Sequence, residues 1–419
     1  MASFYIPLTG LNADSTALNT IANDLANMNT TGYKSHTVNF SDLFSQQIGS
    51  AGSGDPLQVG AGTQVASITT DFSNGSPNST GVDTNVAIQG NGFFVVSDGQ
   101  NQYLTRAGNF AIDDSGNLIT ANGLKVMGYP AANGVVNTNA PIAPVNIPES
   151  EVLSPSATST FNIAANLDST SPLNTTFPAT VNIYDSLGQM HTATVTFKNT
   201  GVNQWSYSIQ IPAADTGGTA APVSGSMTFD SSGNLATVNG TAVGTGTGQV
   251  SSIAVAIPGL TDQAANLNMS WNLMGAGGTP SISQVASQSA VGGTTQNGYA
   301  SGQYQGFTIG ADGTVTVTFS NEQKLNVGQI ALGNVANLQG LRDAGNSDYA
   351  TTMASGTATV GVSGSAGLGS MQNGALEASN VNISAEFSNL IIAQRAFEAN
   401  SKSITTFDTI TQETIQMIH

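Results

Sequence analysis

The sequence has no cysteine and few charged residues, and each shortage excludes a kind of chemistry. Without cysteine, neither a disulfide framework nor a thiolate nucleophile is possible. Charged residues make up only 8% of the chain, with 8 Lys and Arg against 25 Asp and Glu, which gives a formal net charge of -17. Nucleic acids and anionic membranes are bound by clustered cations, so we expect neither as a partner.

Long apolar runs are also absent. No stretch reaches the ~18 consecutive apolar residues that a membrane-spanning helix needs. Near the N-terminus the apolar residues are interrupted by Pro7 and Gly10, and no basic region precedes them. We therefore expect no cleaved secretory signal, and we expect that an exported chain would keep its N-terminus.

Constellations of catalytic or metal-binding residues are hard to find. The histidines His36, His191 and His419 lie far apart in the sequence, although sequence distance alone leaves a triad or metal cluster open. No nucleophile elbow, phosphate-binding loop or dinucleotide fingerprint occurs. The acidic turns at 113–114 and at Asp230 lack the ligand spacing of a calcium loop. We predict no catalytic, cofactor-binding or metal-binding residues, no cofactor and no enzymatic activity.

Both ends of the chain have helical periodicity. At the N-terminus the apolar stripe is Leu11, Leu18, Ile21, Leu25 and Met28. The opposite face has Asn19, Asn23, Asp24 and Asn27, and residues 29–32 break the helix.

The C-terminal stripe is Ile383, Phe387, Leu390, Phe397 and Ile404. Asn382 is a suitable N-cap for a helix of roughly 35 residues. Either each helix covers a local core, or the two stripes cover each other or the same stripes on neighbouring subunits. Glycine-rich sequence between each helix and the middle of the chain favours the second interpretation.

The middle of the chain predicts β-structure. Strands are expected at 86–96, 179–184, 192–197, 205–211 and 314–319, where β-branched and aromatic residues predominate. Turns with Asp, Asn and Gly are expected at 114–117, 186–189, 231–234 and 311–314. The predicted fold is mainly β with terminal α-helices, in which nested β domains are inserted between two coiled-coil helices.

Composition shifts predict the domain boundaries, because glycine- and proline-rich stretches occur in pairs along the chain. We expect an N-terminal helix at 1–30 and a connector at 31–71. A first β domain would take 72–147 and 298–360, around an inserted outer β domain at 148–297. A second connector at 361–378 and a C-terminal helix at 379–419 complete the prediction.

One segment near the N-terminus carries a specific resemblance. It resembles the N-terminal signature of flagellar rod, hook and hook-junction proteins. The residues that carry this resemblance are Asn23, Leu25, Ala26, Asn27, Asn29, Thr30, Gly32, Tyr33 and Lys34. Segments 374–383 and 393–400 are similar to the C-terminal element of the same axial protein family. Segments 82–94, 104–110 and 327–332 resemble the first β domain of its hook and distal rod members.

Within this axial family, the length and the large insertion favour the hook proteins. The resemblance implies a subunit that self-assembles into a curved, flexible tube, couples rod to filament and transmits torque as a universal joint. It further implies that the apolar residues of both terminal helices form the polymer interface. The implied partners are other copies of the chain, the rod, hook-cap and hook-junction proteins, and the flagellar type III export apparatus. The implied location is the extracellular hook and basal body.

Three other interpretations remain open. The chain could be a distal rod or hook-junction protein, a β-rich surface adhesin, or a cell-surface hydrolase, although the last has no identifiable site residues. A smaller motif, Phe40 and Phe44 in 40–44, resembles the element by which rod and hook substrates engage the export gate. Packing of this segment against the terminal helix explains the two phenylalanines equally well.

Overall fold

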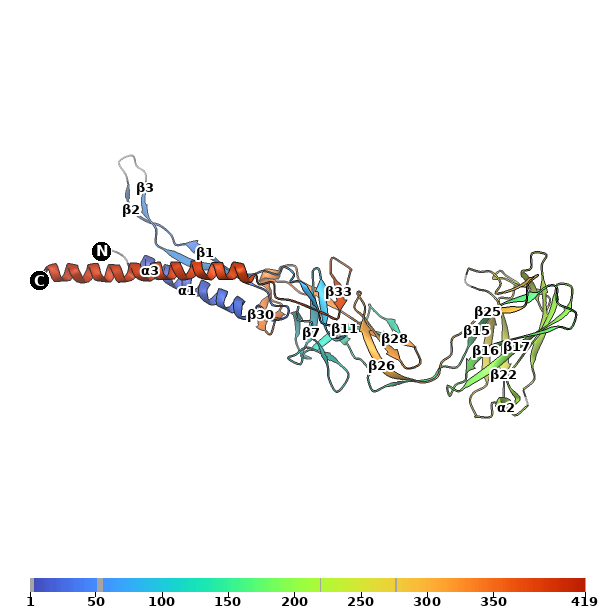
Figure 1. The fold of residues 1–419 in the computed structure, drawn as a ribbon. Coiled ribbons are helices and arrows are strands. Elements are labelled where there is room, and N and C mark those ends of the chain that lie inside the picture. Colours follow the sequence, from blue (N-terminus) through green and yellow to red (C-terminus); the bar gives the residue numbers. More distant parts are fainter. Residues whose placement is uncertain (1–3, 51–55, 219, 276, 419) are drawn as a thin grey trace. The chain divides into compact units, whose positions relative to one another are not determined.

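The computed structural model describes residues 4–50, 56–218, 220–275 and 277–418. The chain forms two compact units, each assembled from separate stretches of sequence. The first unit comprises Met1–Glu149, Gly306–Thr318 and Lys324–His419, and the second comprises Ser150–Gln305 and Phe319–Gln323. The prediction of a mainly β fold with a helix near each terminus is confirmed (Figure 1).

The second unit overlaps the predicted insertion at 148–297 but includes more of the chain. Residues 298–305 and 319–323, which we expected in the first β domain, belong to it. The reason is strand pairing: Tyr299 forms a bridge with Ser156, and Gln303 pairs with Val152. The outgoing and incoming segments of the insertion are therefore held together.

Strands β15 to β25 of the second unit form two sheets, while β14 pairs with β26. The elements in chain order are β14 (Val152–Leu153), β15 (Thr160–Asp168), β16 (Thr176–Tyr184), β17 (Met190–Gly201), β18 (Gln204–Gln210), α2 (Ala213–Thr216), β19 (Val223–Phe229), β20 (Leu235–Val238), β21 (Thr241–Ala242), β22 (Ser252–Ile257), β23 (Leu267–Asn272), β24 (Ile282–Val285), β25 (Ala290–Gln296) and β26 (Gly302–Ile309), the last of which continues into the first unit. One sheet is the antiparallel meander β16-β17-β18-β19-β20-β21, and the other has the order β22-β23-β15-β24 with β25 also on β15.

The two sheets share one apolar core. Buried and partly exposed residues alternate strictly along β15, as expected for a strand with one face on a core. Trp271, Phe161 and Tyr207 lie in this core, with the Phe161 and Trp271 rings stacked 6.1 Å apart. The turns that the sequence predicts around Gly116, Gly188, Gly233 and Gly313 all have a glycine with positive φ.

The first unit contains the remaining elements. They are α1 (Tyr5–Ala26), β1 (His36–Asp42), β2 (Gln46–Ser50), β3 (Pro56–Val59), β4 (Thr63–Thr70), β5 (Pro77–Ser79), β6 (Val86–Gln89), β7 (Phe93–Ser97), β8 (Gln102–Thr105), β9 (Ala111–Ile112), β10 (Leu118–Ile119), β11 (Lys125–Ala132), β12 (Val135–Val136), β13 (Ala143–Pro144), β27 (Thr314–Phe319), β28 (Lys324–Ile330), β29 (Leu332–Asn334), η1 (Leu338–Gly340), β30 (Arg342–Gly345), β31 (Asp348–Ala350), β32 (Thr359–Gly361), β33 (Ser370–Asn373), β34 (Ala375–Glu377) and α3 (Ile383–Ile418). Its main sheet follows the order β27-β28-β11-β7-β8-β31-β30.

Both predicted connectors contain paired strands. In 31–71, β1 pairs with β4 and β2 with β3. In 361–378, β33 pairs with β6 and β34 with β5, so this segment is built into the first β domain. Their glycine content suggested flexible connectors. Strand pairing nevertheless orders these segments, because it satisfies their backbone N–H and C=O groups although they have few large side chains.

The strand predicted at 86–96 is two strands, β6 and β7, separated by a sharp bend. Gly90 and Gly92 at the bend have φ of +108° and +115°, values that residues other than glycine rarely adopt. Among the residues that the structure describes, no helix is long and apolar enough to cross a membrane.

Candidate assembly surface and signature junction

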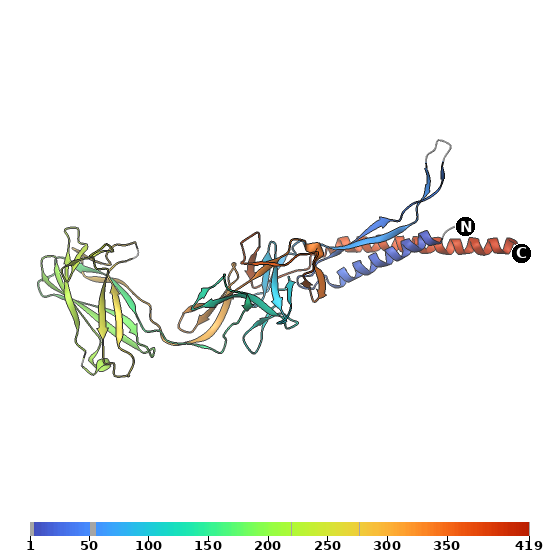
Figure 2. The same ribbon diagram turned by 180° about the vertical axis from the view of Figure 1, so that it is seen from behind.

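The terminal helices α1 and α3 lie side by side and run in opposite directions (Figures 1 and 2). Near the start of α1 the Phe4 ring lies 5.9 Å from the Phe407 ring. About three turns further along α1, Asn400 Nδ2 donates a hydrogen bond of 2.8 Å to Asp14 Oδ2. Ile21, still further along, packs in an apolar cluster with Ala393. The two ends of the chain therefore pair with each other.

Small residues line the seam between the two helices. The buried residues of α1 are Pro7, Gly10, Ala13, Ala17, Ile21 and Asp24. A Cβ atom added to Gly10 would lie 2.7 Å from Asn400 Nδ2, which shows how closely the helices approach there. The predicted stripe is displaced from this seam: Leu11, Leu18 and Leu25 are only partly buried and flank it. Met28 lies beyond the helix end and is 39% exposed.

Asp24, predicted on the solvated face, is fully buried. Its Oδ1 accepts a hydrogen bond of 2.7 Å from the Tyr33 hydroxyl, and its Oδ2 accepts one of 2.8 Å from the His36 backbone N–H. Burial, together with this hydrogen bond to Asp24, raises the pKa of Tyr33. Asn23 Nδ2 donates to the same hydroxyl at 2.8 Å. These bonds hold the turn after α1 against the helix.

A buried ion cluster joins three distant segments of the first unit, and we call it the signature junction. Lys34 Nζ donates to Glu377 Oε1 at 2.6 Å, and the Arg106 guanidinium donates to Glu377 Oε2 at 3.0 Å. The three side chains are 0%, 3% and 1% exposed for Lys34, Arg106 and Glu377. Burial lowers the pKa of Lys34, while the Glu377 carboxylate opposes that shift.

Each member of the junction comes from a motif that carried the family resemblance. Lys34 ends the N-terminal signature, Arg106 lies within 104–110, and Glu377 lies within 374–383. The sequence placed these motifs far apart and gave no sign that one carboxylate serves two cations. Their separate likeness to one family was the only signal that could have linked them.

Other signature residues build the turn that leads into the junction. Gly32 has φ of +68°, and its backbone N–H donates to the Glu377 carbonyl at 2.9 Å. Thr30 Oγ1 donates to Asn27 Oδ1 at 3.0 Å. Ala26 and Asn29 are exposed. Most of the signature is therefore explained by local turn geometry and by attachment to the C-terminal segment.

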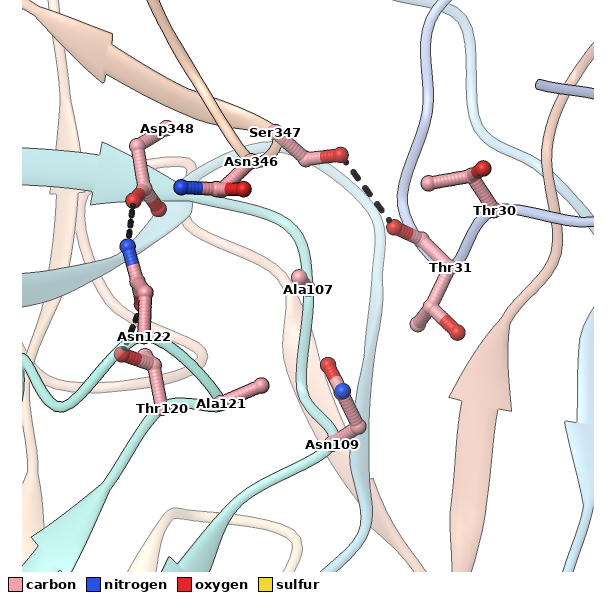
Figure 3. A pocket seen from close by; sticks show the side chains of 10 residues that line it. All are labelled: Thr30, Thr31, Ala107, Asn109, Thr120, Ala121, Asn122, Asn346, Ser347 and Asp348. Carbon is pink, nitrogen blue, oxygen red and sulfur yellow. Dashed lines mark hydrogen bonds between the residues drawn. The ribbon is translucent and has the colours of Figure 1, made fainter.

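A polar pocket of about 270 Å³ lies beside this turn (Figure 3). Thr30 and Thr31 form one wall, and Asn122 Nδ2 on another wall donates to Asp348 Oδ2 at 2.7 Å. Burial raises the pKa of Asp348, and the Asn122 hydrogen bond works against that rise. Ser347 Oγ donates to the Thr31 carbonyl at 3.4 Å and closes one side.

Many apolar side chains of the terminal region face solvent, and we call them together the assembly surface. They are, with exposed fractions, Ile6 41%, Leu8 46%, Ile383 45%, Phe387 52%, Ile391 58%, Ile392 67%, Ile410 51%, Ile415 55% and Met417 80%. Of the predicted interface residues on α3, Leu390, Phe397 and Ile404 are half-buried. An open groove of about 280 Å³ runs between α1, α3 and β1, with Ile392 and Phe40 in its lining.

The two phenylalanines of the suggested export motif differ in their surroundings. Phe40 lines this groove, yet it is 49% exposed, while Phe44 is 99% exposed. Packing against the terminal helix therefore explains in part why a phenylalanine is present at Phe40, but it does not explain Phe44.

Comparisons with known protein families agree with these features. Four family models match in chain order: flagella basal body rod protein at 4–34, flagellar hook protein FlgE/F/G D1 domain at 87–166, flagellar basal body protein FlaE D2 domain at 146–299, and flagellar basal body rod FlgEFG protein C-terminal at 372–417. Together they define the class of rod and hook proteins of the bacterial flagellum.

Full-length relatives define the particular family. The flagellar hook protein FlgE of Salmonella typhimurium is 36% identical over 426 residues, covering 97% of this chain and 98% of the relative. That of Treponema pallidum is 35% identical over 454 residues, covering 98% of each. The chain belongs to the flagellar hook protein family, and it is a hook subunit.

A solved structure supports the fold. The crystal structure of Helicobacter pylori flagellar hook protein FlgE2 matches with a TM-score of 0.55 at 16% sequence identity, covering 72% of this chain and 100% of that chain.

Proposed function

We propose that copies of this chain polymerise through the assembly surface into a curved tube that couples rod to filament. The observation that carries the proposal is the number of large apolar side chains left in solvent on α1 and α3. Scattered exposed apolar residues are ordinary, but a contiguous set marks an interaction site. Ile383, Phe387 and Ile391 follow one another at four-residue spacing and so share one face of α3.

The intramolecular helix pair leaves this apolar surface uncovered. Helix α3 has 36 residues and α1 has 22, and the two meet at Phe407 and Phe4. Ile410, Ile415 and Met417 lie beyond that contact and are at least half exposed. Neighbouring copies of the same helices supply apolar surface of the right kind. A head-to-tail contact of this sort that does not close on itself generates a helical polymer.

The first β domain and the second unit would then form the outer layers of the tube. Charged residues are scarce in the chain, so contacts there would be polar and weak, and neighbouring subunits could slide as the tube bends. The polymer acts as a universal joint without enzymatic activity. Its partners are the rod, hook-cap and hook-junction proteins, and the flagellar type III apparatus exports it with no cleaved signal to the outside of the cell.

Replacing one exposed apolar residue with a charge tests the assembly surface. Phe387 is already half in solvent, so Phe387→Asp should change monomer melting little. In a polymer the same carboxylate would be buried without a partner in every subunit, at a cost of several kcal/mol. Electron microscopy of concentrated protein should therefore show tubes for the wild type and none for Phe387→Asp.

The matched control is Phe387→Leu, which keeps an apolar side chain at the same position and should still form tubes. Normal tubes from Phe387→Asp would contradict the proposed interface. Loss of tubes together with a monomer that melts several degrees lower would show that Phe387 supports the fold of its own chain instead.

We also propose Phe40 and Phe44 as an export element, because Phe44 is almost wholly exposed. Phe44→Ala should lower the amount of chain secreted by flagellated cells without lowering the melting temperature of the purified monomer. Unchanged secretion would contradict this role.

A further inference from the structure

His191 on β17 lies at the centre of a cluster of aspartates in the second unit. Its Nδ1 is 3.0 Å from Asp215 Oδ2, and its Nε2 is 3.1 Å from Asp185 Oδ2 and 3.8 Å from Asp262 Oδ2. The aspartates come from the turn after β16, from α2 and from the loop between β22 and β23. The His191 side chain is 5% exposed and that of Asp185 is 0% exposed.

Two of the carboxylates use one oxygen for their own loop and direct the other toward Nε2. Asp185 Oδ1 accepts backbone N–H groups of its own turn at 2.8 and 2.9 Å. Asp262 Oδ1 accepts a backbone N–H of its own loop at 3.0 Å. Their Oδ2 atoms are thus left for the centre of the cluster, where the ligand atoms of Asp185, His191 and Asp262 all lie within 4.8 Å of one another.

The third aspartate, Asp215, can orient the imidazole. When Asp215 accepts the proton on Nδ1, a neutral His191 presents the lone pair of Nε2 to the two Oδ2 atoms. Three electron-rich atoms then face one another, and they repel unless a cation lies between them. Metal-binding histidines usually have this arrangement, with the second ring nitrogen hydrogen-bonded to a carboxylate.

We propose that His191, Asp185 and Asp262 bind a divalent first-row metal ion of the Zn²⁺ type, with Asp215 orienting the imidazole. Metal–ligand bonds of about 2.0–2.2 Å in a tetrahedral site place neighbouring ligand atoms roughly 3.3–3.6 Å apart. The observed Nε2–Oδ2 distances of 3.1 and 3.8 Å bracket that range. One imidazole nitrogen with carboxylate oxygens suits Zn²⁺, whereas Ca²⁺ takes 6–8 oxygens.

The cluster is open to solvent on one side, where Asp262 lies. Asp262 is 28% exposed, so an ion can enter beside it, and a water molecule can take the fourth position. A bound ion would tie the turn after β16 and the loop between β22 and β23 to strand β17. A proton is the rival occupant: burial lowers the pKa of His191, but the hydrogen bonds that Asp215 and Asp185 accept from the ring outweigh that and raise the pKa.

The test is a Zn²⁺ titration of the full chain without a polyhistidine tag. Calorimetry should give one Zn²⁺ per chain. Tryptophan fluorescence reports on the second unit, because both tryptophans lie in it. The melting temperature followed by this fluorescence should rise by several degrees when Zn²⁺ binds. Co²⁺ should give a visible absorption band. Asp262→Asn keeps its loop hydrogen-bond acceptor and should weaken Zn²⁺ binding at least about tenfold, as Asp215→Asn should.

Two control variants separate this site from other binding. His36→Asn removes the other histidine that contacts an aspartate, and Asp230→Asn removes an aspartate from a similar turn in the same unit. Both should bind Zn²⁺ as the wild type does. A wild type that gains no stability from Zn²⁺, or one whose binding survives Asp262→Asn and His191→Asn, would show that the cluster holds only a proton.

Discussion

The second unit and the terminal helices bury their apolar side chains in opposite ways. Along β15 and β17 every second residue reaches the shared core, and Trp205, Trp271 and Phe197 are at most 1% exposed. On α3, by contrast, Ala393 is buried, while several larger apolar residues are half or more exposed. The β sheets complete their core within one chain, whereas the helices are left with exposed apolar surface.

The contrast teaches that the two regions owe their order to different sources. A core sealed within the chain makes the second unit stable at any protein concentration. A helix pair whose seam has mainly small residues gains little from that seam, so its stability should depend on assembly.

Trp271→Ala should destabilise the second unit by about 3–5 kcal/mol, since it removes a fully buried side chain and leaves a cavity. Urea unfolding can be followed by the fluorescence of Trp205, the remaining tryptophan. Trp271→Phe should cost clearly less. Circular dichroism of the terminal helices should not follow the same transition, and coincident loss of both signals would show that the two regions unfold as one.

Glu377→Gln should destabilise the first unit by about 3–5 kcal/mol, because Lys34 and Arg106 would be left buried without the carboxylate that pairs with both. Hydrogen exchange of peptides that cover β34 would measure the change. The matched control is Glu398→Gln, which breaks an ion pair to Arg395 whose side chains are 78% and 65% exposed. Its effect should stay below about 1 kcal/mol. Equal effects would mean that burial does not matter at the junction.

Calcium should have the smallest effect of all. In the turns at Asp113 and Asp230, each Oδ1 accepts backbone N–H groups of its own turn. Hydrogen bonds from Asn117 and Asn234, respectively, lower the pKa of these carboxyls. Millimolar Ca²⁺ should leave the melting temperature of both units unchanged, in contrast to the response to Zn²⁺. A rise that a chelator reverses would refute the assignment of these residues to turns.

Periodicity predicted both terminal helices and most strands of the core. Asn382 caps α3 as expected, with its Oδ1 accepting from the backbone N–H groups of Ser384 and Ala385. Strand β27 has the predicted bounds, Thr314–Phe319. Patterns of this kind were reliable because local residue types decide them.

Pairings between distant residues were beyond the reach of the sequence. Helical periodicity placed Leu18 in the apolar stripe, but close approach of the helices buries Ala17 and leaves Leu18 only partly buried beside it. Asp24 seemed a solvated residue because its partner Tyr33 lies past the helix end. Likewise, a turn, the short helix α2 and a loop bring aspartates to His191, and the order of these residues along the chain does not predict it. Each miss concerns a contact made by the tertiary fold rather than by local preference.

The signature junction also sets an order of events in time. Lys34 and Glu377 are 343 residues apart in the sequence, yet they share one buried hydrogen bond. Closing so long a loop is slow and entropically costly unless the intervening chain has already folded. A chain that leaves a channel N-terminus first cannot form this bond until nearly all of it has emerged. On the proposed export route the first unit would therefore mature last, and the second unit, continuous in sequence apart from one short hairpin tip, could fold while the C-terminus is still in transit.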